Sequence, residues 1–399
     1  MSEDSHSAWS KLPIDLQEQF YGKVEQEARS LIKVLQESGV ALEEAKPKIR
    51  PYIHASTFGT DTNTKIGAVD GSFSPRASER IGGRFAVYSA GFLMLKDKEI
   101  TDEGYWGDDF RQDQSYPHPL FTAGLQVIES EIEKEASLRA LEKNPDLLLV
   151  DGGFLGFAYS LFKIRKETSV PDWLEKRAQH ALEMTYRLLD SGKCAGVVKR
   201  GRSRAIGGWL SMLARRRSPL VRYLDKQILY AMMSPPSVLD YAEILGRPGF
   251  HRTHTRISEL LDSGRTTDPI EAMEEAKFWA VNSMAKALGT TDERKIRDLE
   301  SRINRIQIRV SEDAPPFELE LAAGSEDRIM RALFSSSDNF NRATGLPIAI
   351  DLVDEYVSLP MEFTKEFVTE VEARLAQMYE GDLNDVKGFF SNMNPQKES

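Results

Sequence analysis

Apolar positions along the 399-residue chain follow two periods, and their alternation predicts the fold class. Where apolar residues recur every three or four positions with charges between them, as at Leu16, Phe20 and Val24, the pattern indicates an amphipathic helix. This spacing predicts helices over residues 16–42, 122–143, 173–191, 220–233, 271–288 and 347–378, the last interrupted near Pro360.

Short apolar runs lie between these helices. Residues 65–69 and 84–95 are rich in β-branched and aromatic side chains, and residues 147–150 and 194–198 are almost wholly apolar, which is typical of strands buried on both faces. Further strands are predicted at 305–310 and 317–321, around a Pro-Pro turn, and a loop is predicted around "GYWGDDF". Helices alternating with buried strands predict an α/β fold.

Composition narrows the class of protein. The chain is 41% hydrophobic, which is enough for a large core, and its net charge of -10 means that a polyanion would have to bind a local basic patch. The single cysteine, Cys194, excludes intramolecular disulfides and cysteine-rich zinc sites. With a polar, acidic start and no run of about 18 apolar residues, we expect a cytoplasmic protein that does not enter a membrane.

Two of the apolar runs lead directly into Asp-Gly, at Asp70 in "IGAVDGSFS" and at Asp151 in "LLLVDGGFLGF". One such dipeptide is an ordinary turn signal. At the ends of two neighbouring strands, however, both side chains would reach one crevice of the sheet, where α/β folds bind ligands. Neighbouring carboxylates repel each other unless a cation lies between them, and Mg²⁺ and Mn²⁺ prefer oxygen ligands. We therefore expect Asp70 and Asp151 to hold a divalent metal.

A glutamate from the helix before Asp151 is expected to add a ligand. Glu131 and Glu135 are four residues apart, so they share a helix face, and the sequence does not separate them as candidates. The alternative is that both belong to a solvated charge run, because Glu129 and Glu133 alternate with them.

The predicted helix that begins near Pro347 carries another pair of acids. Asp351 and Asp354 lie three residues apart on one face, and either could complete the metal site. For Asp351 the better explanation is a favourable position near a helix N-terminus, so Asp354 is the preferred candidate.

Residues 193–224 carry nine basic side chains and no acidic one, which reverses the overall charge. Lys199 directly follows a buried run, so we expect it at the same sheet edge as the aspartates, where it could neutralise a phosphate. Candidate contacts to a nucleic-acid backbone are Arg200, Arg202, Ser203, Arg204, Arg215 and Arg216. A solvated surface is the alternative for "ARRRS". His251 and His254 are interpreted as loop residues that could touch nucleic acid.

Four motifs in this order resemble the NurA nucleases: "AVDGS", "LLLVDGG" after a Glu-bearing helix, "GVVKRGRS", and a C-terminal "GLP" helix. The resemblance implies an RNase H-like mixed sheet flanked by helices, a homodimer, and manganese-dependent DNA hydrolysis with 5′-to-3′ exonuclease and single-strand endonuclease activity. It also implies a hexameric ATPase of the HerA type as partner, in resection of DNA ends or phage defence. The domains would be a helical segment 1–64, a nuclease domain 65–360 with a helical insertion at about 220–300, and a helical C-terminal region and tail 361–399.

The match to the family is uneven. Asp70 and Asp151 match its metal-binding aspartates, the helix before Asp151 supplies its glutamate, and Lys199 matches the lysine after the third strand. Leu346 and Asp354 stand where the family commonly has Tyr and His. The acid in place of His keeps a metal-binding side chain, with an oxygen replacing a nitrogen, which would shift the preference towards Mg²⁺; the expected ion is Mn²⁺ or Mg²⁺.

Two other functions are compatible with the sequence. Loss of the family's Tyr and His is compatible with a catalytically inactive adaptor that docks on a translocase ring. Asp-Gly at strand ends also occurs in actin-like and sugar-kinase-like phosphotransferases, but these need a Gly-rich adenosine-binding segment late in the chain, and "AAGSE" is a poor candidate.

Overall fold

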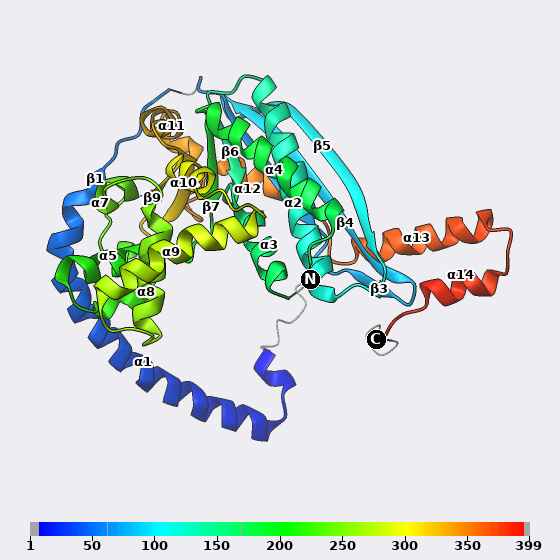
Figure 1. Ribbon diagram of the computed structural model, residues 1–399, viewed down its shortest axis with the longest axis horizontal. Coiled ribbons are helices and arrows are strands. Elements are labelled where there is room, and N and C mark those ends of the chain that lie inside the picture. Colours follow the sequence, from blue (N-terminus) through cyan, green and yellow to red (C-terminus); the bar gives the residue numbers. More distant parts are fainter. Residues whose placement is uncertain (1–7, 62, 168, 395–399) are drawn as a thin grey trace.

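A ten-stranded mixed sheet lies at the centre of the fold (Figure 1). The computed structural model describes residues 8–61, 63–167 and 169–394. The strand order is β1-β8-β9-β10-β7-β6-β2-β4-β3, and β5 pairs with β4. In the middle of the sheet β2 (Ile66–Phe73), β6 (Leu147–Asp151) and β7 (Cys194–Val198) run parallel to one another, and all other pairs are antiparallel.

The outer strands confirm most of the predicted elements and correct one. The predicted loop around "GYWGDDF" is part of a long strand that pairs along β4, in which Trp106 packs on Phe92 and Phe110 on Phe121. The two glycines and the acidic residues between the aromatic ones obscured this two-residue period. The outer strands are β1 (Ile53–Ala55), β3 (Ser78–Arg80), β4 (Gly83–Lys96), β5 (Glu99–Gln112), β8 (Ser237–Asp240), β9 (Ile303–Arg309) and β10 (Phe317–Ala322).

Helices cover both faces of the sheet. The predicted helix over 220–233 is instead a short 3-10 turn, Pro219–Arg222, followed by α6, because Tyr223 and Leu224 are extended. The helix predicted over 347–378 is interrupted at Pro360 as expected, and residues 395–399 of the predicted tail lie outside the described residues. The helices are α1 (Ile14–Ile49), α2 (His118–Glu142), α3 (Gly156–Glu167), α4 (Asp172–Asp190), α5 (Ala205–Ala214), α6 (Asp225–Tyr230), α7 (Tyr241–Leu245), α8 (Phe250–Asp262), α9 (Pro269–Ala287), α10 (Glu293–Ser301), α11 (Glu326–Leu333), α12 (Ile348–Val357), α13 (Phe363–Met378) and α14 (Leu383–Phe390).

The central strands are apolar throughout because each of their faces packs into a separate core. Leu149 of β6 points into a core with Ile350 and Val353 of α12, whereas Leu148 points into a second core with Ala136 of α2. Leu188 of α4 packs into the second core as well. Alternate residues of one strand therefore serve two layers of helices, which explains why the run Leu147–Val150 shows no polar alternation.

Two helical segments extend from this body at opposite sides of the molecule (Figure 1). Helix α1 is 36 residues long, and its buried residues, Ser38, Ala41, Ala45 and Ile49, lie in its C-terminal part. The hairpin of α13 and α14 packs on β4 around Phe85. Among the described residues, no helix combines the length and apolar character needed to span a bilayer.

Candidate active site

The parallel pairing of β2 and β6 brings the two aspartates of the Asp-Gly motifs to one edge of the sheet. The register joins Val69 to Val150, so Asp70 and Asp151 are the next residues on adjacent strands. Asp151 ends β6 as predicted. The prediction that Asp70 also ends its strand is wrong, because β2 runs on to Phe73 by pairing with β4. Asp70 instead lies where β2 loses β6 as its neighbour, and its side chain is buried.

Lys199 and Asp354 complete this edge. Asp151 pairs with Val197 of β7, and Lys199 follows two residues later. Its Nζ lies 2.9 Å from Asp151 Oδ2 and 3.3 Å from Asp354 Oδ2, the latter on α12. Asp351 instead accepts hydrogen bonds from Asn341 Nδ2 (2.6 Å) and Thr344 Oγ1 (3.0 Å) in the preceding loop. It therefore has a structural role at the start of α12.

Helix α2 supplies acids to this edge, but they are Glu129 and Glu133. The helix lies directly over Gly71, where an added Cβ would be 3.2 Å from Glu129 Cγ and 3.5 Å from Glu133 Cβ. After burial, repulsion from Asp70 and Asp151 raises the pKa of Glu129, and repulsion from Asp151 and Glu133 raises that of Asp70. Gly71 allows this close approach, which is why no side chain larger than hydrogen follows Asp70.

The expectation that Glu131 or Glu135 joins the aspartates is therefore corrected. A shift of two residues turns a side chain by about 200° around a helix, so these acids face α4. Glu131 forms an ion pair with Arg177 (2.5 Å) and a hydrogen bond with His180 Nδ1 (2.9 Å). Glu131, Glu135 and His180 form a separate cluster whose candidate ligand atoms lie within 4.8 Å of one another. The sequence signal that was missed is the spacing of Glu129 and Glu133, which equals that of the pair chosen.

The site, defined as Asp70, Glu129, Glu133, Asp151, Lys199 and Asp354, carries excess negative potential. Burial, followed by Asp151 and Glu133, raises the pKa of Asp70 to about 9. Burial raises the pKa of Glu129 and of Glu133 to about 8, the latter against the opposing charge of Lys134. Burial also raises the pKa of Asp151, although Lys199 opposes it.

The lysines compensate this charge only in part. Burial lowers the pKa of Lys199, but Asp151, Asp354 and Asp70 outweigh burial and raise it. The pKa of Lys134 is lowered by burial despite Glu133. Because five carboxyl groups face two ammonium groups, the site favours an added cation, and its purely oxygen donors are those that Mg²⁺ and Mn²⁺ prefer.

The basic segment divides into exposed and buried residues. Arg200 and Arg202, which directly follow Lys199, are exposed, and neither forms an ion pair with any residue in the described ranges. Arg215 and Arg216 are exposed at the end of α5. Arg204 is partly buried and is paired with Asp262 at 3.0 Å. The exposed arginines remain candidate phosphate contacts, whereas Arg204 is already neutralised.

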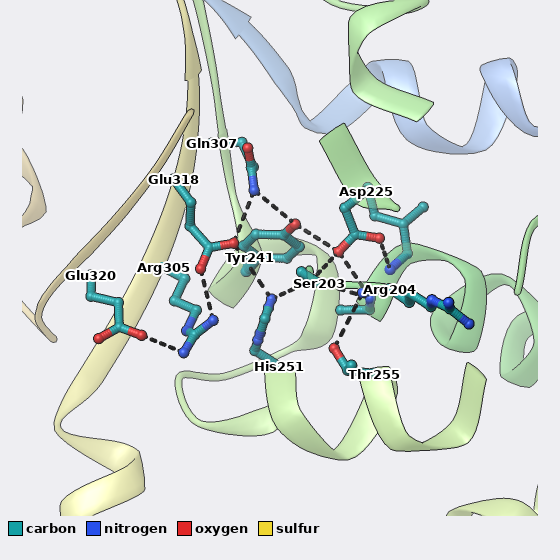
Figure 2. Close-up of polar contacts among 12 residues, drawn as sticks. Ser203, Arg204, Asp225, Tyr241, His251, Thr255, Arg305, Gln307, Glu318 and Glu320 are labelled. Carbon is teal, nitrogen blue, oxygen red and sulfur yellow. Dashed lines mark hydrogen bonds and ion pairs between the residues drawn. The ribbon is translucent and has the colours of Figure 1, made fainter. Parts of the chain in front are cut away.

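Ser203 is part of a buried hydrogen-bond network (Figure 2), so the expectation that it contacts a nucleic-acid backbone is wrong. Its hydroxyl contacts Asp225 and lies 2.5 Å from His251 Nε2. Asp225 also accepts hydrogen bonds from Tyr241 Oη (2.7 Å) and from the N–H groups of Ala205 and Ile206 (both 2.9 Å). This network fixes the segment that follows Lys199.

The two histidines expected in a loop lie on α8. His251 and His254 are both buried, and burial lowers both pKa values. The "HRTHTR" segment lies in the first turns of α8, which packs closely on α5: a Cβ at Gly208 would lie 2.1 Å from His254 O. Neither histidine is therefore an exposed contact for nucleic acid.

A second buried group supports the loop after Asp151, and the sequence did not reveal it. Arg305 on β9 pairs with Glu318 (2.7 Å) and with Glu320, both on β10. Glu320 Oε2 in turn accepts a hydrogen bond from the N–H of Phe154 at 2.8 Å. The signal was the alternation of charges in "RIQIRV" and "FELEL", whose charged positions face one another across an antiparallel pair.

The fold defines an RNase H-like α/β protein, with a mixed sheet flanked by helices and acids at the edge where the parallel strands end. Among solved structures, the chain is similar to the NurA nuclease from Sulfolobus solfataricus, with 12% identity over 90% of this chain and 98% of that chain and a TM-score of 0.55. At this identity the likeness shows the fold.

Other solved structures are more distant. A NurA structure with manganese matches with 13% identity, over 91% of this chain and 99% of that chain, with a TM-score of 0.41. Endonuclease V from Bacillus subtilis matches with 15% identity, over 82% and 92% of the two chains, with a TM-score of 0.31. No family model and no curated protein matches the chain.

Proposed function

We propose that this protein is a metal-dependent DNA nuclease that hydrolyses phosphodiester bonds at the edge of the sheet marked by Asp70 and Asp151. One observation carries the proposal. Carboxyl groups from β2, α2, β6 and α12 gather at this edge, two of them in contact with Lys199, and Arg200 and Arg202, which are exposed and form no ion pair within the described ranges, follow Lys199 closely in the sequence. A negative pocket next to a positive strip suits an ion-assisted reaction of a polyanion.

The side chains of the site offer the oxygen donors that a divalent ion takes, and they would have to move closer together to hold one, because among the described residues the three ligand atoms that lie within 4.8 Å of one another are those of Glu131, Glu135 and His180. Asp70, Asp151 and Asp354, with Glu129 and Glu133, would hold it. Burial together with neighbouring carboxylates raises the pKa of Asp70, Glu129, Glu133 and Asp151, so bringing these groups together has an electrostatic cost that a cation would relieve. When bound, the ion would polarise the phosphate and promote ionisation of a water.

The chain's own side chains would place the substrate. Arg200 and Arg202 would hold the backbone phosphates on either side of the cut, without reading sequence. The ammonium of Lys199 would neutralise charge on the reacting phosphate as the water oxygen adds to phosphorus and the bond to the leaving oxygen breaks. To do so, Lys199 must exchange part of its pairing with Asp151 and Asp354 for the phosphate.

The test is incubation of the purified full-length protein with end-labelled single- and double-stranded DNA in Mn²⁺, in Mg²⁺ and in EDTA. We expect products with either ion and none in EDTA. Asp70→Asn should abolish cleavage while the far-UV circular dichroism and the elution volume stay unchanged. Cleavage by this variant at the wild-type rate would refute the assignment.

Finer features of the function are proposals that rest on the motif resemblance. These are 5′-to-3′ exonuclease and single-strand endonuclease activity, action with a HerA-type hexameric ATPase in end processing or phage defence, a homodimer, and a cytoplasmic location. The division into segments 1–64, 65–360 and 361–399 also stays a prediction. Exposed apolar side chains on α1, such as Ile14, Ile32 and Leu35, and Met378 on α13 support the presence of partner surfaces there. Light scattering and co-purification with the ATPase test these points.

A catalytically inactive adaptor is the second candidate. The observation in its favour is that Lys199 already bridges Asp151 and Asp354, which neutralises part of the site without an added ion. Calorimetric titration with Mn²⁺ separates the candidates: saturable binding that is lost in Asp70→Asn supports the nuclease, and its absence in the wild type supports the adaptor.

A further inference from the structure

A cavity of about 470 Å³ opens beside the proposed active site. Its lining includes Gly153, two residues after Asp151, and Arg200, Gly201 and Arg202, which follow Lys199. The two chain segments that leave β6 and β7 thus border the carboxylates and also the cavity. Most of the remaining lining comes from α3, α7, α8, α9, β9 and β10, with single residues from β7 and α10 and a few from loops.

The sides of the cavity offer aromatic surface. Tyr159 of α3 and Trp279 of α9 both line it. Tyr159 is 63% exposed and so lies at the mouth, whereas Trp279 is partly buried and contacts the guanidinium of Arg252 at 5.6 Å. Flat aromatic faces of this kind bind bases of single-stranded nucleic acid by stacking, whatever the base.

Polar groups of the network in Figure 2 form another part of the lining: Tyr241, His251, Arg305, Glu318 and Glu320. His251 is 7% exposed, and its Nδ1 has no hydrogen-bond partner among the described residues. Glu318, also buried, accepts hydrogen bonds from Arg305 Nη1 (2.7 Å) and Gln307 Nε2 (3.0 Å), which hold this part of the lining in place.

We infer that this cavity receives one nucleobase of the DNA strand that is cut at the neighbouring carboxylates. The inference rests on the proposed function. The volume lies within the range of small-ligand sites, and a base presents both a flat apolar face and an edge of donors and acceptors. Arg200 and Arg202 line the cavity and closely follow Lys199, so a backbone held by them would place a base at its mouth.

The base that enters the cavity belongs to a continuous DNA strand, because Arg200 and Arg202, which would hold backbone phosphates, lie at the rim of the cavity. A base held there fixes which phosphodiester reaches the carboxylates. The cavity thereby acts as a positioning site for the cut, and it tolerates all four bases because stacking supplies most of its contact.

The test is an abasic scan. A set of single-stranded oligonucleotides, each with one abasic residue at a different distance from a fixed cleavage site, is cut by the full-length protein in Mn²⁺, and binding of the same set is measured by fluorescence anisotropy in EDTA. We expect one position, or two adjacent ones, at which loss of the base lowers the cleavage rate and the affinity about five-fold or more, the effect of losing one base–aromatic stack.

Matched variants connect that position to the cavity. Trp279→Ala and Tyr159→Ala should remove the position dependence, so that intact and abasic oligonucleotides are cut at equal, lower rates. Tyr159 is largely exposed, so its variant keeps the test valid if Trp279→Ala unfolds. Phe278→Ala is the control, because Phe278 is 72% exposed on the same helix and does not line the cavity; it should retain the wild-type profile.

The outcomes separate the two proposals. Cleavage with no sensitive position, or a sensitive position unchanged in both aromatic variants, would overturn the base site and leave the nuclease assignment standing. A protein that neither cuts nor binds DNA would refute the nuclease assignment, and the base site with it.

Discussion

Replacing Asp70 by Asn should stabilise the metal-free protein, and this is the sharpest consequence of the carboxylate cluster. In the folded protein, burial, then Asp151 and Glu133, raise the pKa of Asp70 to about 9 from its ordinary value of 3.8. Asparagine has nearly the same size and no charge, so the substitution removes the repulsion and leaves the packing. A stabilising effect at a buried polar position is otherwise rare, since most substitutions destabilise.

The sign and size follow from proton linkage. A group whose pKa is higher in the folded than in the unfolded state contributes stability that is fully present below the unfolded value and is lost as pH rises towards the folded value. For Asp70 this window runs from about pH 4 to about pH 9. A pH of 7.5 is about 3.7 units above the ordinary pKa of 3.8, so at 1.36 kcal/mol per unit the stability lost at Asp70 has a ceiling of about 5 kcal/mol. Relaxation and water entry reduce this, so we expect Asp70→Asn to gain about 2 to 5 kcal/mol.

The assay is urea unfolding of wild type and Asp70→Asn in EDTA at pH 5, 6.5 and 8, followed by circular dichroism. The difference between the two proteins isolates Asp70, because all other groups titrate in both. We expect this difference to grow in favour of the variant from pH 5 to pH 8. Added Mn²⁺ or Mg²⁺ should then stabilise the wild type more than the variant, since the ion relieves a repulsion that the variant lacks.

A particular result would refute the reasoning. If the variant is less stable than the wild type in EDTA at pH 8, or if the difference does not change with pH, Asp70 is not held in a cluster of repelling carboxylates. The metal site would then lose its physical basis, whatever the nuclease assays show.

Further substitutions separate the residues of the site. Glu133→Gln should lower the cleavage rate by about 100-fold or more and weaken Mn²⁺ binding in calorimetry. Glu131→Gln is its matched control, two residues earlier on the same helix. This control should keep its activity within about two-fold of the wild type and lose only about 1 kcal/mol of stability. Lys199→Met should lower kcat by about 10²- to 10³-fold without weakening Mn²⁺ binding, because it removes a positive charge beside Asp151. Asp225→Ala should cost about 3 to 5 kcal/mol in urea unfolding, since it leaves several buried donors without an acceptor.

The two aspartates could be predicted from the sequence because a continuous apolar run identifies a buried strand. A run such as Leu147–Val150 is too apolar to lie elsewhere than inside a sheet, and the residue after it must emerge at an edge. The same reasoning placed Lys199 after β7, and the position of Asp351 near a helix N-terminus, where an acid is favoured in any case, made Asp354 the preferred candidate. In each case a local sequence pattern predicted at which edge of the sheet the side chain would lie.

The choice between the pairs on α2 could not be made in this way. Glu129, Glu131, Glu133 and Glu135 form two equivalent pairs at a spacing of four, and only the contact of α2 with β2 and α4 decides which pair faces Asp70. Ser203 shows the same limit: Arg202 before it is exposed and Arg204 after it is only partly buried, whereas the burial of Ser203 depends on Asp225, 22 residues later. Tertiary contacts of this kind leave no periodic signal.

The glycines after Asp151 explain how one edge of the sheet can position both the carboxylates and part of the cavity lining. Gly152 has a φ of +81°, which favours glycine, and a Cβ at Gly196 of β7 would lie 2.5 Å from its carbonyl oxygen. A Cβ at Gly153 would lie 2.7 Å from Glu320 Oε2. The loop is therefore packed between β7 and Glu320: a side chain at Gly153 would press on Glu320, and one at Gly152 would have open space but an unfavourable φ. Because this packing fixes the backbone directly after Asp151, the carboxylate on one side and the cavity lining on the other are held by the same short segment. A larger residue at either position should disturb metal binding and base placement together.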